Sequence, residues 1–544
     1  MKIMNRSLFK ASRNYRFDDL VEAFRWDVPE YFNIAKAVCD DNIIRSSDVG
    51  LICEDEDGRC ETYSYQKLYQ LANQLANVLT KYGVTFGDRI AVVLPQRVET
   101  AIAHIAIWKL GAISVPLSVL FGPEALDYRL SDSGAKLVFS DSDHQSILSE
   151  LASTVPSLKT VINCDANVIG GFWELLSFAK DTYDTTVTKA NDPAIIIYTS
   201  GTTGPPKGAL VAHRCLLGNL PGFELSHDFF PQKGDLFWTP ADWAWTGGLI
   251  DALLPAMYYG VPVLGYNAGK FDAERICQLI SKHKVRNAFI PPTALKMMRQ
   301  VSNIHKYELC LRSVMSAGEA MGAELYHWGR EYLSIEINEM WAQSEFNYIV
   351  GNSASIMPVR PGSMGKAYPG HRVVPIDGHG SILLPGEAGE LAAHRDDPVM
   401  FLGYWNNDSA TQSKVIGDWW TTGDLGYRDE EGYLWFLGRK DDVISSAGYR
   451  IGPGEIEDCL IKHPAVAQAA VVGVPDDLRG EIVKAYLVLV EGVKGDAALV
   501  ADIQRTVRKS LAAYEYPREI EFLESLPMTT TGKIRRLELR NTVR

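Results

Sequence analysis

Residues 199–208 read T-S-G-T-T-G-P-P-K-G and directly follow the apolar run I-I-I-Y at 195–198. A short β-branched run that turn residues terminate predicts a buried strand ending in a loop. Glycines in that loop let the backbone approach a ligand closely, and their N–H groups can form an anion-binding concavity. The hydroxyl groups and Lys207 add donors and a positive charge. The stretch therefore predicts a loop that binds an oligophosphate; a flexible surface turn is the alternative.

The loop differs from the common nucleotide-binding pattern G-x-x-x-x-G-K-[ST]. Counted from Gly201, that pattern needs a second glycine where Pro206 stands, and Gly208 rather than a hydroxyl residue follows Lys207. The stretch instead resembles the phosphate loop of the adenylate-forming superfamily. This superfamily includes acyl-CoA synthetases, the adenylation domains of peptide synthetases and firefly-type luciferases.

The resemblance covers roughly the last two thirds of the chain, with its motifs in the family's order. The matching stretches are W-A-Q-S-E (341–345), T-T-G-D-L-G (421–426), G-R-K-D-D (438–442), A-G-Y-R-I-G-P (447–453) and T-G-K (531–533). Residues 435–475 are most similar to acyl-CoA synthetases for medium-chain acids and their acetyl-CoA synthetase relatives. The resemblance implies an AMP-forming ligase that joins a carboxylic acid to coenzyme A at the expense of ATP.

The composition limits the class of protein. At 544 residues the chain is too long for a single core, and its net charge of −13 without a basic block argues against nucleic-acid binding. Eight scattered cysteines without a C-x-x-C pair predict free thiols in a reducing compartment. The most apolar stretches, near 101–122 and 247–266, are interrupted, so no transmembrane segment is expected. We expect a cytoplasmic protein, either monomer or homodimer; the basic residues 1–17 would instead fit a mitochondrial transit peptide.

Strands alternate with helices along much of the chain, which predicts an α/β fold of parallel β-sheets covered by helices on both faces. Ser64 is the predicted N-cap of a helix that Gly83 ends. Turn residues crowd between about 355 and 436 and predict a small β-rich subdomain. The resemblance implies a large N-terminal domain, residues 1–440, and a smaller, mobile α+β C-terminal domain, residues 441–544, that acts as a lid.

The resemblance also assigns a nucleotide site. In adenylation the carboxylate attacks the α-phosphorus of ATP, so the protein must supply positive charge and a metal. Glu345, a hard oxygen ligand, would bind magnesium, and Lys207 would assist catalysis. The expected contacts to the outer phosphates are Thr199, Ser200, Gly201, Thr202, Thr203 and Gly204, and those to the adenine are Gly318, Glu319 and Ala320. Ser344 is expected at the α-phosphate, with Trp341 and Gln343 as further nucleotide contacts. Asp424 and Arg439 are expected at the ribose, and Arg450 at a phosphate. Outside this context, Glu345 would be a solvated glutamate and Asp424 a turn cap.

Lys533 in T-G-K would by itself be a solvated lysine of the tail. In the family, the lysine of this motif neutralises the charge that builds between carboxylate and α-phosphate, so Lys533 is the expected catalytic cation. Asp441 resembles the hinge residue about which the C-terminal domain rotates between half-reactions. The expected coenzyme A contacts are Ala447, Gly448, Tyr449, Arg479 and Tyr516, with Gly448 along the pantetheine tunnel. Arg479 could equally be an ordinary surface charge.

Ala342 occupies the position that faces the acyl chain in this family, where acetyl-CoA synthetases carry tryptophan and medium-chain enzymes glycine. Its small side chain leaves room for an acid of roughly four to ten carbons, since each buried CH₂ contributes about 0.8 kcal/mol. Trp245 is expected to form another wall, or to be a core tryptophan. The alternatives are a ligase that loads a carrier protein, an acetyl- or propionyl-CoA synthetase and, in a different class, a non-catalytic nucleotide-binding protein.

Overall fold

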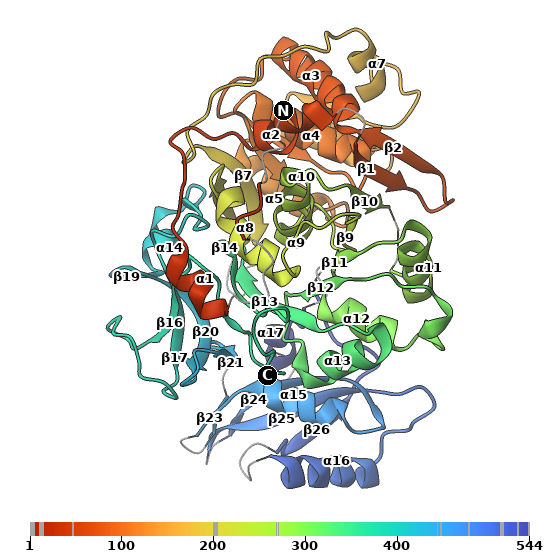
Figure 1. Cartoon of the computed structure of the whole chain (residues 1–544). Helices are drawn as coiled ribbons and strands as arrows, with labels where there is room; N and C mark the ends of the chain where they lie inside the picture. Colours follow the sequence, from red (N-terminus) through yellow and green to blue (C-terminus); the bar gives the residue numbers. More distant parts are fainter. Residues whose placement is uncertain are drawn as a thin grey trace. The chain divides into compact units, whose positions relative to one another are not determined.

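The computed structural model describes residues 6–9, 16–45, 48–199, 205–267, 269, 271–442, 444–446, 449–476, 479–511, 516–529 and 533–541. The chain forms two compact units. The first contains Met1–Arg372 and His394–Val415, and the second contains Val373–Ala393 and Ile416–Arg544. Each unit has its own sheets (Figure 1). The domain limits 1–440 and 441–544 stay a prediction.

A seven-stranded sheet of the first unit carries the phosphate-loop stretch. Its order is β18-β8-β7-β4-β3-β5-β6. The strands are β3 (Arg89–Val92), β4 (Ile113–Pro116), β5 (Leu137–Ser140), β6 (Thr160–Asn163), β7 (Pro193–Thr199), β8 (Lys207–Ala212) and β18 (Gly403–Tyr404). The strands β7, β4, β3, β5 and β6 are parallel to one another. At the other end of the sheet, β8 is antiparallel to β7 and β18 is antiparallel to β8. The sheet is therefore mixed, although the sequence pattern predicted parallel pairing.

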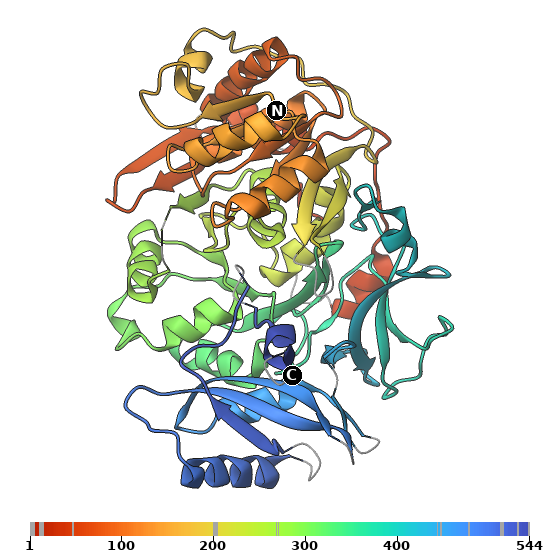
Figure 2. The same cartoon turned by 180° about the vertical axis from the view of Figure 1, so that it is seen from behind.

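Helices cover both faces of this sheet (Figure 2). They are α4 (Val98–Lys109), α5 (Pro123–Ser133) and α6 (Gln145–Thr154). α5 and α6 pack on one face in a common hydrophobic cluster with β3, β4 and β5. α4 lies on the other face, where Nδ1 of His104 is 2.6 Å from Oγ of Ser114 in β4. Every residue of α4 is buried, as expected for a helix that is apolar on all sides.

The helix predicted after Ser64 is present as α3 (Tyr65–Lys81). The Ser64 hydroxyl accepts a hydrogen bond from the N–H of Lys67 at 3.2 Å, which satisfies one of the unpaired donors at the helix start. Gly83 follows the helix with a φ of 74°. This left-handed conformation suits glycine because it has no Cβ, so both predicted ends of the helix are confirmed.

A nine-stranded sheet completes the core of the first unit, in the order β15-β14-β13-β12-β11-β9-β10-β1-β2. Its strands are β1 (Val49–Glu54), β2 (Cys60–Ser64), β9 (Phe237–Trp238), β10 (Val263–Tyr266), β11 (Asn287–Phe289), β12 (Ser313–Ser316), β13 (Ile337–Gln343), β14 (Phe346–Gly351) and β15 (Lys366–Ala367). One face packs against α11 (Ala273–His283), α12 (Pro292–Arg299) and α13 (Gly322–Trp328). The other face meets α8 (Cys215–Ser226), where Asn338 in β13 donates to the carbonyl of Ser226 at 2.8 Å.

The second unit contains two five-stranded sheets. The first consists of β16 (Val373–Ile376), β17 (Gly389–His394), β19 (Val415–Ile416), β20 (Trp419–Arg428) and β21 (Leu434–Arg439). The second consists of β22 (Ile444–Ser446), β23 (Tyr449–Ile451), β24 (Val466–Asp476), β25 (Gly480–Leu489) and β26 (Glu519–Phe522). One face of the latter packs against α15 (Pro453–Ile461) and α16 (Ala497–Ser510), and the other against α17 (Arg536–Asn541).

The first unit also contains six shorter α-helices among its described residues, of which α2 and α10 are largely buried. They are α1 (Phe17–Ala23), α2 (Ile34–Val38), α7 (Phe172–Ser177), α9 (Thr246–Gly248), α10 (Leu254–Tyr258) and α14 (Asp408–Gln412). Among the described residues, no helix combines the length and the apolar character needed to span a membrane. The α/β fold class, with a large N-terminal part of helix-covered sheets and a smaller α+β C-terminal part, is confirmed.

Candidate active site

The phosphate-loop stretch connects two antiparallel strands. Thr199 is the last residue of β7, Lys207 is the first residue of β8, and the two residues pair in register. The Thr199 hydroxyl donates to the Lys207 carbonyl at 3.4 Å. Ser200, Gly201, Thr202, Thr203 and Gly204 lie outside the described residues. The stretch therefore runs between two paired strands, and Lys207 is held by the sheet itself.

Lys207 and Glu345 meet at a tyrosine that the sequence analysis did not single out. Tyr404 in β18 donates a hydrogen bond from its hydroxyl to Oε1 of Glu345. Nζ of Lys207 lies 5.2 Å from the centre of the same ring, within the range of a cation–π contact. Two side chains from distant motifs thus share one aromatic partner. The only sequence signal was an aromatic residue in the turn-rich stretch 403–407, which does not reveal such a contact.

The W-A-Q-S-E stretch forms the end of β13 and the turn into β14. The Trp341 ring packs on that of Phe346, with centroids 5.5 Å apart, and a β-bulge separates Trp341 from Gln343. Ala342, Ser344 and Glu345 are half-buried. Of the oxygen atoms of Glu345, Oε1 is bound by Tyr404, while Oε2 has no hydrogen-bond partner among the residues that the structure describes. This oxygen is of the type that Mg²⁺ prefers, so the donor fits the expected metal.

The predicted adenine segment follows the neighbouring strand β12. β12 and β13 are parallel, so their carboxyl ends lie at the same edge of the sheet, where ligands often bind in α/β proteins. Gly318 is exposed and has a φ of 100°, a conformation that L-residues rarely adopt. Glu319 accepts hydrogen bonds from the Thr293 hydroxyl at 2.9 and 3.0 Å, and Ala320 is exposed. The backbone at 318–320 is thus accessible at the same edge as 341–345.

Trp245 stands at the start of α9 and is half-buried. Its ring lies edge-on to Phe121, with centroids 5.6 Å apart, and the guanidinium of Arg129 lies 4.0 Å from the Phe121 ring centre. Trp243, two residues earlier, is the fully buried tryptophan of this stretch. The partial exposure of Trp245 is compatible with a pocket wall, which stays a prediction.

The two predicted ribose contacts lie side by side in the second unit. Asp424 in β20 pairs in register with Arg439 in β21, and Nη1 of Arg439 donates to Oδ1 of Asp424 at 2.7 Å. The same nitrogen donates to the carbonyl of Thr422 at 3.1 Å. Burial disfavours the charge of Arg439, but the adjacent Asp424 carboxylate raises its pKa overall. Arg439 therefore stays charged and holds Asp424 in one orientation.

Lys533 lies in a short, closed loop. An antiparallel bridge joins Met528 and Ile534, the Lys533 carbonyl accepts from the N–H of Thr529 at 2.7 Å, and the Lys533 N–H donates to the Thr529 hydroxyl at 3.0 Å. Thr530, Thr531 and Gly532 lie outside the described residues. The Lys533 side chain is exposed, so its backbone is fixed while its ammonium group remains accessible.

The predicted hinge residue Asp441 is exposed. Its neighbour Asp442 accepts hydrogen bonds from Arg540 at 2.8 Å and from Arg536 at 3.5 Å. Arg536 also donates to the buried Glu457 of α15 at 2.7 and 3.0 Å. α17 is thereby connected to the segment that follows β21, a connection that the sequence analysis did not identify.

Only some of the predicted coenzyme A contacts can be placed. Ala447 and Gly448 lie outside the described residues, and Tyr449 and Arg450 belong to β23. Arg479 is exposed, and its N–H donates to Asp476 at 2.8 Å. Two arginines, Arg508 and Arg518, lie 3.8 and 5.2 Å from the ring centre of Tyr516. Positive charge therefore surrounds this tyrosine, as a site for a phosphorylated ligand requires.

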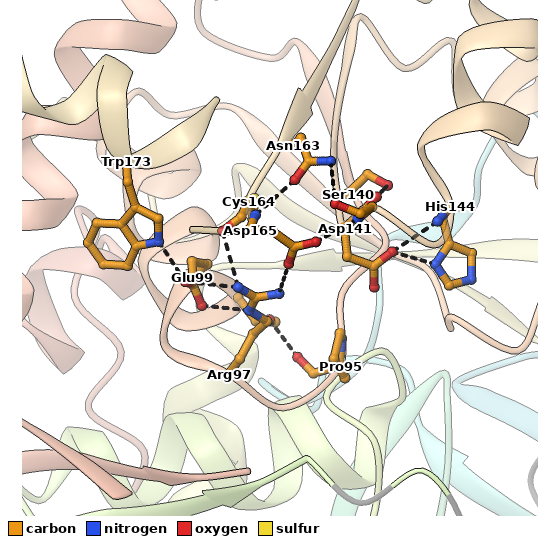
Figure 3. Close-up of polar contacts among 12 residues, drawn as sticks. Pro95, Arg97, Glu99, Ser140, Asp141, His144, Asn163, Cys164, Asp165 and Trp173 are labelled. Atoms are coloured by element: carbon orange, nitrogen blue, oxygen red, sulfur yellow. Dashed lines mark hydrogen bonds and ion pairs between the residues drawn. The ribbon is translucent and has the colours of Figure 1, made fainter. Parts of the chain in front are cut away.

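A further polar cluster lies at the carboxyl ends of β3, β5 and β6 (Figure 3). The guanidinium of Arg97 donates to Glu99 at 2.7 and 3.0 Å and to Asp165 at 2.7 Å. Nε1 of Trp173 donates to the same Glu99 carboxylate at 2.8 Å. Two carboxylates therefore already occupy the arginine, and the cluster joins loops rather than offering a free charge to a ligand.

One group among the described residues has the spacing of metal ligands: Glu54, Cys60 and His283. Glu54 is buried, and its carboxylate is bound by Lys282 at 2.8 Å and by His283. Burial opposes ionisation of Glu54, but these hydrogen bonds lower its pKa overall. Because basic groups already neutralise this carboxylate, the cluster is an ion-pair network and is separate from the magnesium site expected at Glu345.

Comparison with known proteins gives matches along nearly the whole chain. The family model for AMP-binding enzymes matches residues 45–405, and that for the AMP-binding enzyme C-terminal domain matches residues 455–533. The uncharacterised acyl-CoA ligase YtcI of Bacillus subtilis (strain 168) is 36% identical over 493 residues, which are 90% of this chain and 92% of that protein. Mitochondrial acyl-coenzyme A synthetase ACSM3 of Rattus norvegicus is 34% identical over 542 residues, 96% of this chain and 93% of that one. The crystal structure of the anthranilate CoA ligase AuaEII in complex with anthranoyl-AMP has a TM-score of 0.87 and 28% identity, and covers 95% of this chain and 98% of its own.

Proposed function

The chain belongs to the family of AMP-binding enzymes, and from this premise we propose that it is an AMP-forming acyl-CoA synthetase. In the first half-reaction, an oxygen of the substrate carboxylate bonds to the α-phosphorus of ATP and pyrophosphate leaves. In the second, the thiol of coenzyme A attacks the carbonyl of the acyl-adenylate, and AMP leaves with the electrons of the anhydride bond. The similar proteins described above are named acyl-CoA ligases or synthetases, which supports this reaction.

The observation that carries the proposal is the meeting of Lys207 and Glu345 at Tyr404. A cation at the base of a glycine-rich loop can bind the outer phosphates, together with Thr199 and the loop residues 200–204. Magnesium, when bound, would neutralise the charge of the phosphates, and Oε2 of Glu345 is the oxygen that would hold it. We assign Ser344 to the α-phosphate, and Trp341, Gln343 and residues 318–320 to the nucleoside.

The residues of the second unit take complementary roles in the proposal. Asp424, held by Arg439, has a carboxylate that can accept both hydroxyls of a ribose. Lys533 neutralises the charge that develops as the carboxylate approaches the α-phosphorus, and Arg450 contacts a phosphate. Asp441 is the hinge about which residues 441–544 rotate, so that Lys533 withdraws and coenzyme A gains access. Ala447, Gly448, Tyr449, Arg479 and Tyr516 then contact coenzyme A.

For the acid we propose a straight or branched chain of roughly four to ten carbons, because Ala342 and Trp245 leave an apolar space and each buried CH₂ adds about 0.8 kcal/mol. An acetyl- or propionyl-CoA synthetase and a ligase that loads a carrier protein are the alternative proposals. We propose the cytoplasm as the location, with the mitochondrial matrix as the alternative.

Product analysis tests the proposal. The purified protein is incubated with ATP, magnesium and a panel of acids from acetate to decanoate, with benzoate and anthranilate added, each with and without coenzyme A. We expect AMP and pyrophosphate with at least one acid, and an acyl-CoA thioester only when coenzyme A is present. ADP as the product, or no AMP with any acid, would overturn the proposed function.

A further inference from the structure

Tyr404 touches both charged groups to which we assign the phosphates and the metal. We propose that Tyr404 is a positioning residue of the adenylation site, whose hydroxyl orients Glu345 for the metal and whose ring holds Lys207 apart from that carboxylate. The inference rests on the proposed function, because the roles of Lys207 and Glu345 come from it.

The backbone around Tyr404 is fastened on both sides. The N–H of Phe401 donates to the carbonyl of Glu345 at 2.8 Å, so the segment just before β18 is bonded directly to the turn that carries the Glu345 carboxylate. The N–H of Trp405 donates to the carbonyl of Gly208 at 2.7 Å, next to Lys207. The segment 401–405 therefore connects the phosphate-loop hairpin to the β13–β14 turn, with Tyr404 between the two attachments.

Gly208 permits this close approach. A Cβ at this position would lie 2.8 Å from Cγ2 of Ile196 and 3.3 Å from Cβ of Trp405, so a larger residue would push β18 away from β8. Tyr404 is 7% exposed, so its ring is packed between the two attachments of this segment. The ring position is thus set by packing rather than by its two charged partners.

Without the ring of Tyr404, the charges of Lys207 and Glu345 would act on each other directly. Both charges contact the same ring, and an ammonium group and a carboxylate attract each other more strongly in a half-buried site than in water. Yet in the part of the chain that the structure describes, Lys207 forms no ion pair, and Oε1 of Glu345 is taken by the phenol. Tyr404 gives each charge a neutral partner, so the lysine stays available to phosphate and the second carboxylate oxygen stays available to a cation.

Two substitutions separate the two contacts. Tyr404→Phe removes the hydroxyl and keeps the ring, whereas Tyr404→Leu removes both. The matched control is Tyr63→Phe, which removes another phenol–carboxylate hydrogen bond, to the exposed Glu61, within β2 and outside the proposed site. Binding of Mn²⁺ as a substitute for Mg²⁺ is measured as the ratio of the protein's affinities for Mn²⁺-saturated ATP and for metal-free ATP. Binding of ATP without metal is measured by calorimetry.

We expect Tyr404→Phe to weaken Mn²⁺ binding about tenfold, because a hydrogen bond to a charged group is lost, and to leave metal-free ATP binding within about twofold. Tyr404→Leu should weaken metal-free ATP binding about fourfold, because the cation–π contact is lost as well. Tyr63→Phe should change neither. Unaltered Mn²⁺ binding in Tyr404→Phe, or an equal loss in Tyr63→Phe, would overturn the inference. Failure of the wild-type protein to form AMP would instead overturn the proposed function, since the binding measurements do not depend on turnover.

Discussion

Nη2 of Arg540 donates a hydrogen bond to Oδ1 of Asp442 at 2.8 Å and so connects helix α17 to the residue after the proposed hinge, Asp441. Arg536, at the start of the same helix, bonds to Asp442 and to the buried Glu457. Since α17 begins shortly after Lys533, the position of the lysine loop depends on these contacts. The hinge and the proposed catalytic cation thus share a support within one unit.

Replacing Arg540 by methionine tests this support. The substitution keeps an unbranched, flexible side chain but removes the bond to Asp442, so α17 and the Lys533 loop should move more freely. We expect adenylation, measured by pyrophosphate exchange, to slow about tenfold, because small errors in position slow catalysis strongly. Thioester formation from preformed acyl-AMP should change by less than about twofold, because that step does not use Lys533.

The matched control is Arg535→Met. Arg535 pairs at 2.6 Å with Glu538 of the same helix, and both side chains are about half exposed, so only a local surface pair is lost. Equal slowing in Arg535→Met and Arg540→Met would show that the bond to Asp442 has no special role.

Lys533→Ala should separate the two half-reactions completely. Loss of one charge contact to the transition state typically costs about 3–4 kcal/mol, or about 10² to 10³ in rate. We expect this loss in acyl-AMP formation only, with thioester formation from synthetic acyl-AMP retained. Single-turnover assays of each half-reaction measure both effects. A similar decrease in both would rule out the proposed role of Lys533.

Ala342→Trp should shorten the preferred acid. The indole would fill the space that we assign to the acyl chain, so each CH₂ that no longer fits forfeits about 0.8 kcal/mol of binding. We expect the preference, measured as kcat/KM across acids of increasing length, to move toward acetate and propionate. Ala342→Gly is the control and should retain the longer acids. An unchanged profile in Ala342→Trp would place the acyl pocket elsewhere.

Glu224 in α8 gives the stability a dependence on pH. This carboxyl group is fully buried and accepts hydrogen bonds from the Tyr259 hydroxyl at 2.6 Å, the Ser7 hydroxyl at 3.0 Å and the N–H groups of Leu8 and Phe9. Burial raises its pKa from 4.5 to about 7, although the hydrogen bonds act in the opposite direction. The folded protein therefore keeps a proton that the unfolded chain releases between these two pH values.

The contribution of Glu224 is complete below about pH 4.5 and is lost as the pH rises through 7. Between pH 5 and 8 the loss is about 2.5 kcal/mol of unfolding free energy. Glu224→Gln cannot titrate, so its difference in urea midpoint between pH 5 and pH 8 should be smaller than that of the wild type. The exposed Glu174→Gln should retain the wild-type difference. The prediction is wrong if Glu224→Gln and the wild type show the same difference.

The sequence was sufficient where local signals dominate. The Ser64 cap and Gly83 stop define α3, and the phosphate-loop stretch begins at the end of a buried strand, β7, as its β-branched run predicts. The resemblance placed Asp424 and Arg439 at one sugar; the two are hydrogen-bonded to each other, and their role at a ribose stays a prediction. Features of this kind depend on residues that lie close together in the sequence and on strong turn residues, so they can be predicted from the sequence.

Long-range pairing was not accessible in the same way. β18 pairs with β8 through Tyr404 and Ala209 and through Gly403 and Leu210, across a large separation in sequence, and this two-residue strand has no pattern of its own. The role of Tyr404 likewise depends on two charged partners from other motifs, and that of Asp442 on a helix at the chain's end. These contacts are products of tertiary packing, which residue spacing does not encode.

The arginine-centred cluster of Figure 3 has a practical consequence for the interpretation of natural variants. A natural or library variant with an uncharged residue at position 97 would lose the partner of two carboxylates, one of which, Glu99, is almost completely buried. The resulting defect would be seen as low protein abundance at unchanged activity per folded molecule. Variants here should therefore be ranked by expression level before any assay of turnover.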